Sequence, residues 1–206
     1  AAVNARLQNN GQSCIAAKRF IVVENIAEKF IDLYIKKFES LSVGEPMNEN
    51  TDLGPLVNEQ SLKEIQKQVN DSVTKGARIL YGGKRIERSG YFFEATILGD
   101  VNPGMPAYEE EIFGPVASII TVKDAEEALR VANDSRFGLG ASLWTSDMNL
   151  AEQLAARLEA GAVFINSMVK SDPRLPFGGT KKSGYGRELS HYGIKEFVNI
   201  KTVWMQ

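Results

Sequence analysis

Residues 116–166, VASIITVKDAEEALRVANDSRFGLGASLWTSDMNLAEQLAARLEAGAVFIN, alternate between short apolar runs and longer segments with helical spacing. The apolar runs predict strands, and the amphipathic segments predict helices. The expected elements are strands at 116–122, 141–145 and 161–166, a helix at 124–133 capped by Asp124, and a helix from Ser146 or Asp147 to about residue 158. This spacing is that of right-handed βαβ units, so we predict an α/β fold in which a largely parallel sheet is covered by helices.

The segments on either side of this region extend the same pattern. Apolar residues recur at helical spacing over 26–41 and 61–76, and each pattern predicts a helix with one buried face. The remaining expected elements are strands at 19–24, 77–81, 92–98 and 197–205, a short helix at 188–194, and loops at 42–55 and 167–186. The last strand has no clean polar face, so we expect it either to close an edge of its own sheet or to pair with another subunit.

The composition is that of a globular protein with a proper core. Of the 206 residues, 43% are hydrophobic and 24% are charged, and the net charge of −2 gives no reason to expect nucleic acid or a membrane as partner. No apolar run could span a bilayer, and no secretory signal is recognisable. A single cysteine excludes an internal disulfide and favours a reducing, cytoplasmic setting. Because the chain starts without methionine and inside an expected helix, we expect it to be a piece of a longer protein.

The only cysteine lies in the stretch Asn9-Asn10-Gly11-Gln12-Ser13-Cys14-Ile15-Ala16, just after a predicted helix of small residues. A thiol reacts as the thiolate, which a helix start or a nearby cation favours. The asparagine and glutamine side chains can hydrogen-bond without adding negative charge. Two interpretations stay open at this point, a reactive thiol and a buried structural cysteine.

The long loop contains two candidate binding segments. Residues 176–188, PFGGTKKSGYGRE, lack both the Gly-Lys-Ser order of a phosphate-binding loop and the spacing of a dinucleotide fingerprint. We therefore expect a tight-turning loop that passes close to a ligand or a catalytic group. Just before it, Ser171-Asp172-Pro173-Arg174 offers an arginine for two roles, a bidentate clamp on a carboxylate or a surface ion pair.

Two further candidates lie outside these segments. Residues 108–116, YEEEIFGPV, are either a solvated loop or a site in which a carboxylate accepts hydrogen bonds from a sugar diol. His191 is the sole candidate base for a cysteine hydrolase, and its polar neighbours also suit a surface position. No group of histidine, cysteine and carboxylates has metal-ligand spacing, so we expect no metal site.

Five motifs in order resemble the aldehyde dehydrogenase superfamily over nearly the whole chain. They are Leu7-x-x-x-Gly11-Gln12-x-Cys14, Glu111-x-Phe113-Gly114-Pro115-Val116, Phe137-Gly138-Leu139, Gly161 to Asn166, and Pro176-Phe177-Gly178-Gly179 with Ser183-Gly184-x-Gly186-Arg187-Glu188. Within that superfamily, Ser171-Asp172-x-Arg174 and Glu188-Leu189-Ser190-His191-Tyr192-Gly193 are similar to the bacterial succinate-semialdehyde dehydrogenases. Gln8 departs from the pattern, because some of those enzymes have an arginine there.

The resemblance implies a role for each matching residue. Cys14 would attack an aldehyde carbonyl, its own backbone N–H would hold part of the oxyanion, and a thioester would follow hydride transfer to NAD or NADP. Glu111 would hold the nicotinamide ribose, and Phe113 would pack near the nicotinamide. The implied substrate-binding residues are Phe177 in the substrate tunnel and Ser171 and Arg174 at a substrate carboxylate.

The resemblance also implies what residues 1–206 lack, which is the dinucleotide-binding domain, the general-base glutamate and the oxyanion asparagine of the family. We therefore expect a catalytic domain over 1–195, an oligomerisation strand over 196–206 in a homodimer or homotetramer, and an isolated chain that is inactive. NAD or NADP would be bound mainly by the missing domain. The alternatives are a dehydrogenase of another aldehyde, a hydrolase using Cys14 and His191, and a non-catalytic association domain.

Overall fold

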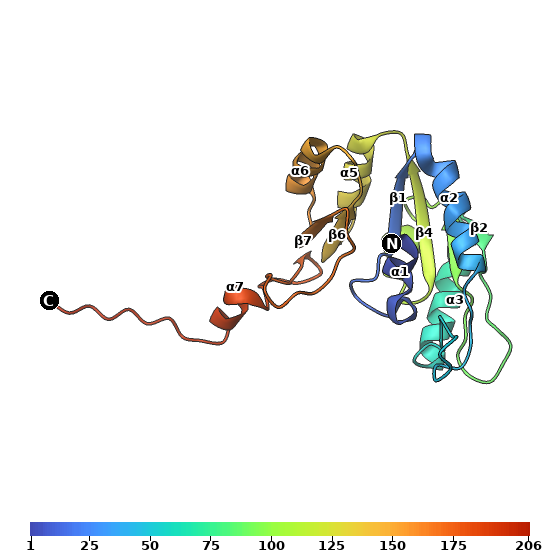
Figure 1. Cartoon of the computed structure of the whole chain (residues 1–206), viewed down its shortest axis with the longest axis horizontal. Helices are drawn as coiled ribbons and strands as arrows, with labels where there is room; N and C mark the ends of the chain where they lie inside the picture. The colour runs from blue at the N-terminus through green and yellow to red at the C-terminus, as the bar shows by residue number, and fades with distance from the viewer. The chain divides into compact units, whose positions relative to one another are not determined.

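The computed structural model describes residues 1–206 and divides into two compact units, residues 1–134 and 135–206 (Figure 1). The first unit holds a four-stranded sheet in the order β1-β4-β3-β2, in which β1 and β3 pair parallel with β4 and β2 pairs antiparallel with β3. Its elements are α1 (Ala2–Leu7), η1 (Gln8–Gly11), β1 (Arg19–Val23), α2 (Glu24–Glu39), α3 (Glu59–Thr74), β2 (Arg78–Tyr81), β3 (Thr96–Gly99), α4 (Pro106–Glu109), β4 (Val116–Val122) and α5 (Ala125–Asn133).

The strand β4 forms the middle of this unit, because both of its faces are buried. Val116 and Ile120 belong to a hydrophobic cluster that also contains the apolar residues of α3, whereas Ala117 and Ile119 belong to a second cluster with residues of α1 and α2. Successive side chains of a strand point to opposite faces, so this alternation places one core on each side of the sheet. A nearly continuous apolar run is what a strand buried on both faces requires.

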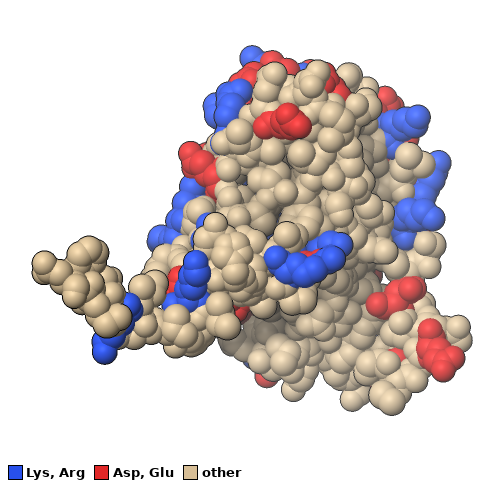
Figure 2. Space-filling model, turned by 60° about the vertical axis from the view of Figure 1, so that its left-hand side comes forward, with Lys and Arg blue, Asp and Glu red and all other residues tan.

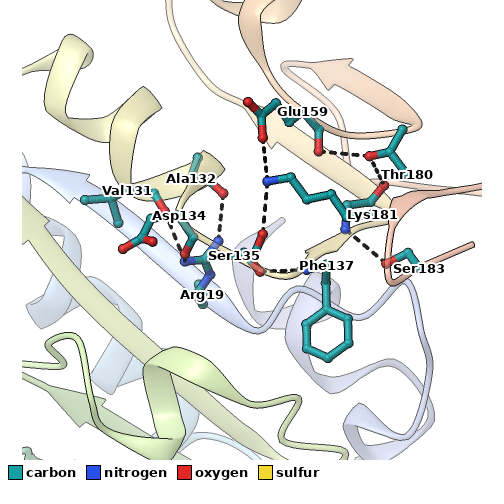
Figure 3. Close-up of polar contacts among 11 residues, drawn as sticks. Arg19, Val131, Ala132, Asp134, Ser135, Phe137, Glu159, Thr180, Lys181 and Ser183 are labelled. Carbon is teal, nitrogen blue, oxygen red and sulfur yellow. Dashed lines mark hydrogen bonds and ion pairs between the residues drawn. The ribbon is translucent and has the colours of Figure 1, made fainter.

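The helices expected at 26–41 and 61–76 are formed as α2 and α3, each beginning two residues earlier than predicted, and α5 begins after Asp124 as predicted. Asp124 caps α5 by accepting a hydrogen bond from the Glu127 N–H at 2.8 Å, and Asn58 caps α3 through the Ser61 N–H at 2.8 Å. At the other end of α5, the Arg19 guanidinium donates to the carbonyl oxygens of Val131, Ala132 and Asp134 (Figure 3). A cation there satisfies carbonyls that have no partner within the helix.

The second unit contains the βαβ motif that the sequence predicts. The strand β6 (Gly140–Leu143) pairs parallel with β7 (Ala162–Ile165), and α6 (Met148–Arg157) connects them with Asp147 as its N-cap. A second, antiparallel pair joins β5 (Phe137–Gly138) to β8 (Thr180–Lys181), and α7 spans Ser190–Lys195. Next to this pair, the Lys181 Nζ donates to the Ser135 carbonyl at 3.0 Å and pairs with the Glu159 carboxylate at 2.6 Å (Figure 3).

The structure differs from the sequence prediction at several short elements. Pairing is largely parallel, as predicted, but β4 and β6 belong to different sheets, so residues 116–166 do not form one continuous sheet. The strand expected from residue 92 begins at Thr96, because Phe92 and Phe93 are buried without a regular ladder of backbone hydrogen bonds. The elements α4, β5 and β8 were not predicted, since two to four residues are too few to show a period.

The strand predicted over residues 197–205 is not formed. These residues leave α7 as extended chain without secondary structure (Figure 1), and their apolar side chains are exposed, 88% for Phe197 and 86% for Trp204. A strand exists only where a neighbour takes its N–H and C=O groups, and none does so here. The strand and its pairing with another subunit therefore remain a prediction, as does the boundary of the catalytic domain at residue 195.

Surface charge is mixed in the molecule. On the face shown in Figure 2, lysine and arginine side chains are interspersed with aspartate and glutamate side chains, in keeping with a net charge of −2. None of the helices combines the length and the apolar character that crossing a lipid bilayer demands.

Candidate active site

The loop that carries Cys14 begins with a sharp change of backbone direction. After α1, the residues Asn9 and Asn10 have φ values of 50° and 56°, and Gly11 has a φ of 75°. Asparagine and glycine are the residues that best tolerate this left-handed region. The chain therefore turns out of the helix and leaves Cys14 exposed. Exposure excludes the role of a core cysteine within this structure and favours the reactive interpretation.

Two amide side chains fix this loop to the segment 54–57. The Asn10 Oδ1 accepts from the Gly54 N–H at 3.1 Å, and its Nδ2 donates to the Pro55 carbonyl at 3.1 Å. The Gln12 Oε1 accepts from the Val57 N–H at 2.9 Å. Asn10 and Gln12 are thus the polar anchors of the thiol loop, and neither adds a negative charge beside the thiol.

Two motifs that are about 100 residues apart in the sequence meet at Gly11. A Cβ atom on Gly11 would lie 2.1 Å from the Gly114 carbonyl oxygen, and one on Gly114 would lie 2.1 Å from the Ile65 Cδ1. Close packing against backbone requires a glycine at Gly11, in addition to its positive φ, whereas at Gly114 a Cβ would meet the end of the Ile65 side chain, which can move. This contact sets the thiol loop against the segment that contains Glu111 and Phe113.

Lys18 connects the thiol loop to that segment. Its Nζ donates to the carbonyl oxygens of Ser13 at 2.9 Å, Cys14 at 3.1 Å and Ala16 at 3.0 Å. The same ammonium pairs with the Glu111 Oε1 at 2.9 Å and lies 5.7 Å from the centroid of the Phe113 ring. Lys18 could not be recognised from the sequence, because a lysine four residues after a cysteine carries no motif signal.

The electrostatics around the loop are dominated by two partly or fully buried cations. Burial lowers the pKa of Lys18, and the hydrogen-bonded Glu111 opposes that shift. Burial also lowers the pKa of Arg6 to about 10, so this guanidinium is still charged at neutral pH. Arg6 is fully buried, and its Nη2 donates to the Gly11 carbonyl at 2.7 Å. Arg6 and Lys18 thus both hold the thiol loop through its backbone carbonyls.

Glu111 and Phe113 present their side chains to solvent, and the residue between them does not. Phe113 is 43% exposed and the Glu111 side chain 39%, whereas Ile112 is buried at 2%. A carboxylate beside an exposed aromatic ring can accept hydrogen bonds from a diol and can pack against a flat ring. The structure thus brings Cys14, Glu111 and Phe113 together within the first unit, with Lys18 between them.

The predicted loop of residues 176–188 folds back on itself in the second unit. Phe177 and Glu188 exchange two backbone hydrogen bonds of 2.8 Å each, and Phe177 is half-buried at this bridge. A Cβ on Gly161 would lie 1.7 Å from the Gly178 carbonyl oxygen. The tight turning was therefore predicted correctly, and the close approach at this glycine is to the chain's own backbone.

The other predicted substrate residues, Ser171 and Arg174, are exposed in the same unit. The Arg174 guanidinium forms a bidentate pair with Asp172, through Nε at 2.9 Å and Nη2 at 2.6 Å. This pair holds the pKa of the Asp172 carboxyl well below its usual range. His191 is exposed in α7, and its ring packs against Tyr192 with centroids 4.1 Å apart.

Comparison with known proteins identifies the family. A model of the aldehyde dehydrogenase family matches residues 1–203. The succinate-semialdehyde dehydrogenase (NADP+) 1 of Mycobacterium tuberculosis is 50% identical over 204 residues, which are 99% of this chain and 45% of that protein. The probable succinate-semialdehyde dehydrogenase (NADP+) of a Synechocystis strain is 52% identical over 204 residues, which are again 99% of this chain and 45% of that protein. The chain belongs to the aldehyde dehydrogenase family.

Solved structures agree with this assignment. The succinic semialdehyde dehydrogenase of Streptococcus pyogenes, determined in complex with NADP+, is 42% identical and has a TM-score of 0.96. The match covers 99% of this chain and 45% of that one. The lactaldehyde dehydrogenase of Escherichia coli is 33% identical, also with a TM-score of 0.96, over 100% of this chain and 43% of that one. Relatives with different named substrates thus share this fold. The chain spans about 45% of the length of the curated relatives it matches.

Proposed function

We propose that this chain is the thiol-bearing part of an NAD(P)-dependent dehydrogenase that oxidises succinate semialdehyde to succinate. The observation that carries the proposal is the junction at Lys18, where the exposed Cys14 loop meets the carboxylate of Glu111 and the ring of Phe113. The named activities of the M. tuberculosis and Synechocystis relatives support the choice of aldehyde. A dehydrogenase of another aldehyde is the alternative.

Cys14 performs the covalent chemistry in this proposal. Its sulfur attacks the aldehyde carbonyl carbon, the S–C bond forms, and the carbonyl oxygen becomes the oxyanion of a thiohemiacetal. That carbon then gives up hydride and becomes the carbon of a thioester. Water hydrolyses the thioester, which releases the acid and restores the thiol. The Cys14 N–H donates to no other group of the structure, so it is available to the oxyanion.

Glu111 and Phe113 serve the cofactor in this proposal. The Glu111 carboxylate accepts hydrogen bonds from the ribose hydroxyls, and the Phe113 ring packs near the nicotinamide. When bound, NAD(P)+ supplies the hydride acceptor and leaves as NAD(P)H. The general base, the second oxyanion donor and most of the dinucleotide site lie in a further domain of the intact subunit, so we propose that residues 1–206 alone are inactive.

Arg174, Ser171 and Phe177 provide substrate selection in this proposal. Arg174 already binds one carboxylate in bidentate geometry, that of Asp172. A substrate carboxylate would take the place of Asp172 on the same guanidinium, Ser171 would add a hydroxyl donor, and Phe177 would line the path of the carbon chain. We also propose a cytoplasmic homodimer or homotetramer, because the single thiol suits a reducing compartment and the apolar end of the chain needs a partner.

The test is a steady-state screen of the intact subunit with succinate semialdehyde and butanal, each with NAD+ and NADP+. We expect the KM for succinate semialdehyde to be well below that for butanal. Arg174→Ala should raise the KM for succinate semialdehyde about tenfold and leave that for butanal unchanged, because it removes a charge-assisted pair. Arg88→Ala, which breaks the exposed Arg88–Glu45 pair at 2.7 Å, is the matched control.

Cys14→Ser should lower kcat by at least about a thousandfold. His191→Ala should leave kcat unchanged, whereas a hydrolase would lose its activity. Equal KM values for both aldehydes would overturn the choice of substrate. Retained turnover in Cys14→Ser, or steady turnover by residues 1–206 alone, would contradict the proposed mechanism.

A further inference from the structure

Lys18 has a contact set that no motif of the chain accounts for. Only 19% of its side chain is exposed, and its Nζ has four oxygen acceptors between 2.9 and 3.1 Å. Three of them are backbone carbonyls of the thiol loop, and the fourth belongs to Glu111. An ammonium group has three N–H donors, so all of them are used and one is shared.

The contact with Ser13 determines the direction of the Cys14 N–H. The Ser13 carbonyl and the Cys14 N–H belong to one trans peptide unit, in which C=O and N–H point in opposite directions. Because the Ser13 oxygen is aimed at Lys18, the Cys14 N–H is aimed away from it. That oxygen also accepts the Ala16 N–H at 3.1 Å, so both of its lone pairs are used and the peptide plane cannot easily rotate.

The fourth contact of Lys18 is the ion pair with Glu111, the residue that binds the cofactor ribose in the proposed function. The ion pair with Glu111 restrains a carboxylate whose side chain is 39% exposed and would otherwise sample several rotamers. Lys18 also lies near the Phe113 ring, 5.7 Å from its centroid. A change in the position of Glu111 therefore changes the position of the ammonium that holds the thiol loop.

We propose that Lys18 is a positioning residue that couples the thiol loop to the cofactor carboxylate, so that one ammonium group orients the Cys14 N–H and holds Glu111 in place. This inference rests on the proposed function, in which Glu111 binds the cofactor ribose. Binding at Glu111 then changes the conformation of the Cys14 loop, and the loop is correctly set only when the carboxylate is in position.

The test measures the rate of Cys14 alkylation by iodoacetamide in the intact subunit, with and without saturating NADP+. The variants are Lys18→Met, Glu111→Gln and the double variant, and Lys63→Met is the matched control. Lys63 pairs with Glu59 at the same 2.9 Å distance, but on the exposed surface of α3. We expect NADP+ to change the rate in the parent protein, and this response to fall at least about fivefold in Lys18→Met but not in Lys63→Met.

A second readout works without cofactor. In the absence of NADP+, the effects of Lys18→Met and Glu111→Gln on the alkylation rate should not multiply, because both remove the same contact. Independent effects, or a full NADP+ response in Lys18→Met, would overturn the inference. If NADP+ has no effect on the parent protein, it is the role of Glu111 in the proposed function that fails, and the cofactor-free cycle still decides on Lys18.

If Lys18→Met does not fold, Lys18→Gln takes its place in the test. It keeps N–H donors for the loop carbonyls and removes the charge that holds Glu111. We expect its NADP+ response to fall as in Lys18→Met, because the charge that holds Glu111 is gone. A purely structural role of Lys18 would change the melting temperature and leave the response to NADP+ intact, which would also overturn the inference.

Discussion

At the scale of single residues, Gly11 determines whether the thiol loop can form. It combines a φ of 75° with a very close backbone approach, since a Cβ atom at this position would lie 2.1 Å from the Gly114 oxygen. The motif Gly11-Gln12-x-Cys14 is visible in the sequence, but its physical reason is this contact with Gly114. The glycine therefore serves the packing of two segments, and the cysteine follows at the place where the loop is held.

Gly11→Ala should lower the free energy of unfolding by about 3 kcal/mol, because the methyl group meets the Gly114 carbonyl and the backbone is strained. Gly104→Ala is the matched control, since Gly104 also has a positive φ, 87°, but nothing lies within 4 Å of its Cβ position. That control should cost about 1 kcal/mol. Equal losses in equilibrium urea unfolding would show that steric contact at Gly11 contributes nothing.

At the scale of elements, the two termini of α5 are stabilised in different ways, one by neighbouring residues and the other by a distant residue. Its N-terminus is fixed locally, because the Asp124 carboxylate accepts the Glu127 N–H and the Glu127 carboxylate accepts the Lys123 N–H at 2.9 Å. Its C-terminus depends on Arg19, which comes from β1, more than 100 residues earlier in the chain (Figure 3). The first contact was predictable from the sequence, and the second was not.

Asp124→Ala should lower the free energy of unfolding by about 1 kcal/mol, because the first turn of α5 loses its cap. Glu28→Ala is the control, since it removes one exposed acidic side chain from the interior of α2 without touching a cap. It should change stability by less than about 0.5 kcal/mol. Chemical unfolding curves of the two variants measure this free energy. A loss in Glu28→Ala as large as that in Asp124→Ala would contradict a stabilising role of the cap.

At the scale of the whole molecule, the last ten residues carry apolar side chains that nothing covers. Ile200 is 82% exposed and Val203 is 71% exposed, although both residue types favour strands. Their backbone groups have no ladder to join within this chain. An extended apolar segment with free hydrogen-bonding groups is suited to pairing with a sheet edge of a second subunit.

Truncation of the intact subunit after Glu196 should reduce its mass in light scattering to a smaller oligomer or a monomer, because the pairing segment is lost. Ile26→Ser is the control, since it removes a different exposed apolar side chain, 52% exposed on α2. That variant should keep the parent mass. An unchanged oligomer after truncation would remove the terminal segment from the interface.

Elements whose signals are local could be predicted from the order of the amino acids. The apolar run Val116–Val122 was predicted to the residue, and Asp124 was predicted as an N-cap, because periodicity and capping depend on neighbours along the chain. For α6 the sequence left Ser146 and Asp147 open as the cap, and the structure has Asp147. The thiol motif and the Glu111-x-Phe113 motif were recognisable through their resemblance to the motifs of the aldehyde dehydrogenases. The sequence could not show that the two motifs meet.

The side chains that connect these motifs became known only from the folded chain. The contacts of Lys18 with Glu111 and of Gly11 with Gly114 join segments that are about 100 residues apart, and no local pattern records them. The sequence left Arg174 open between a clamp on a substrate carboxylate and a surface ion pair, and in the folded chain it pairs with Asp172. The terminal strand did not form because none of the residues 1–206 pairs with it, and a strand is a property of two segments rather than one.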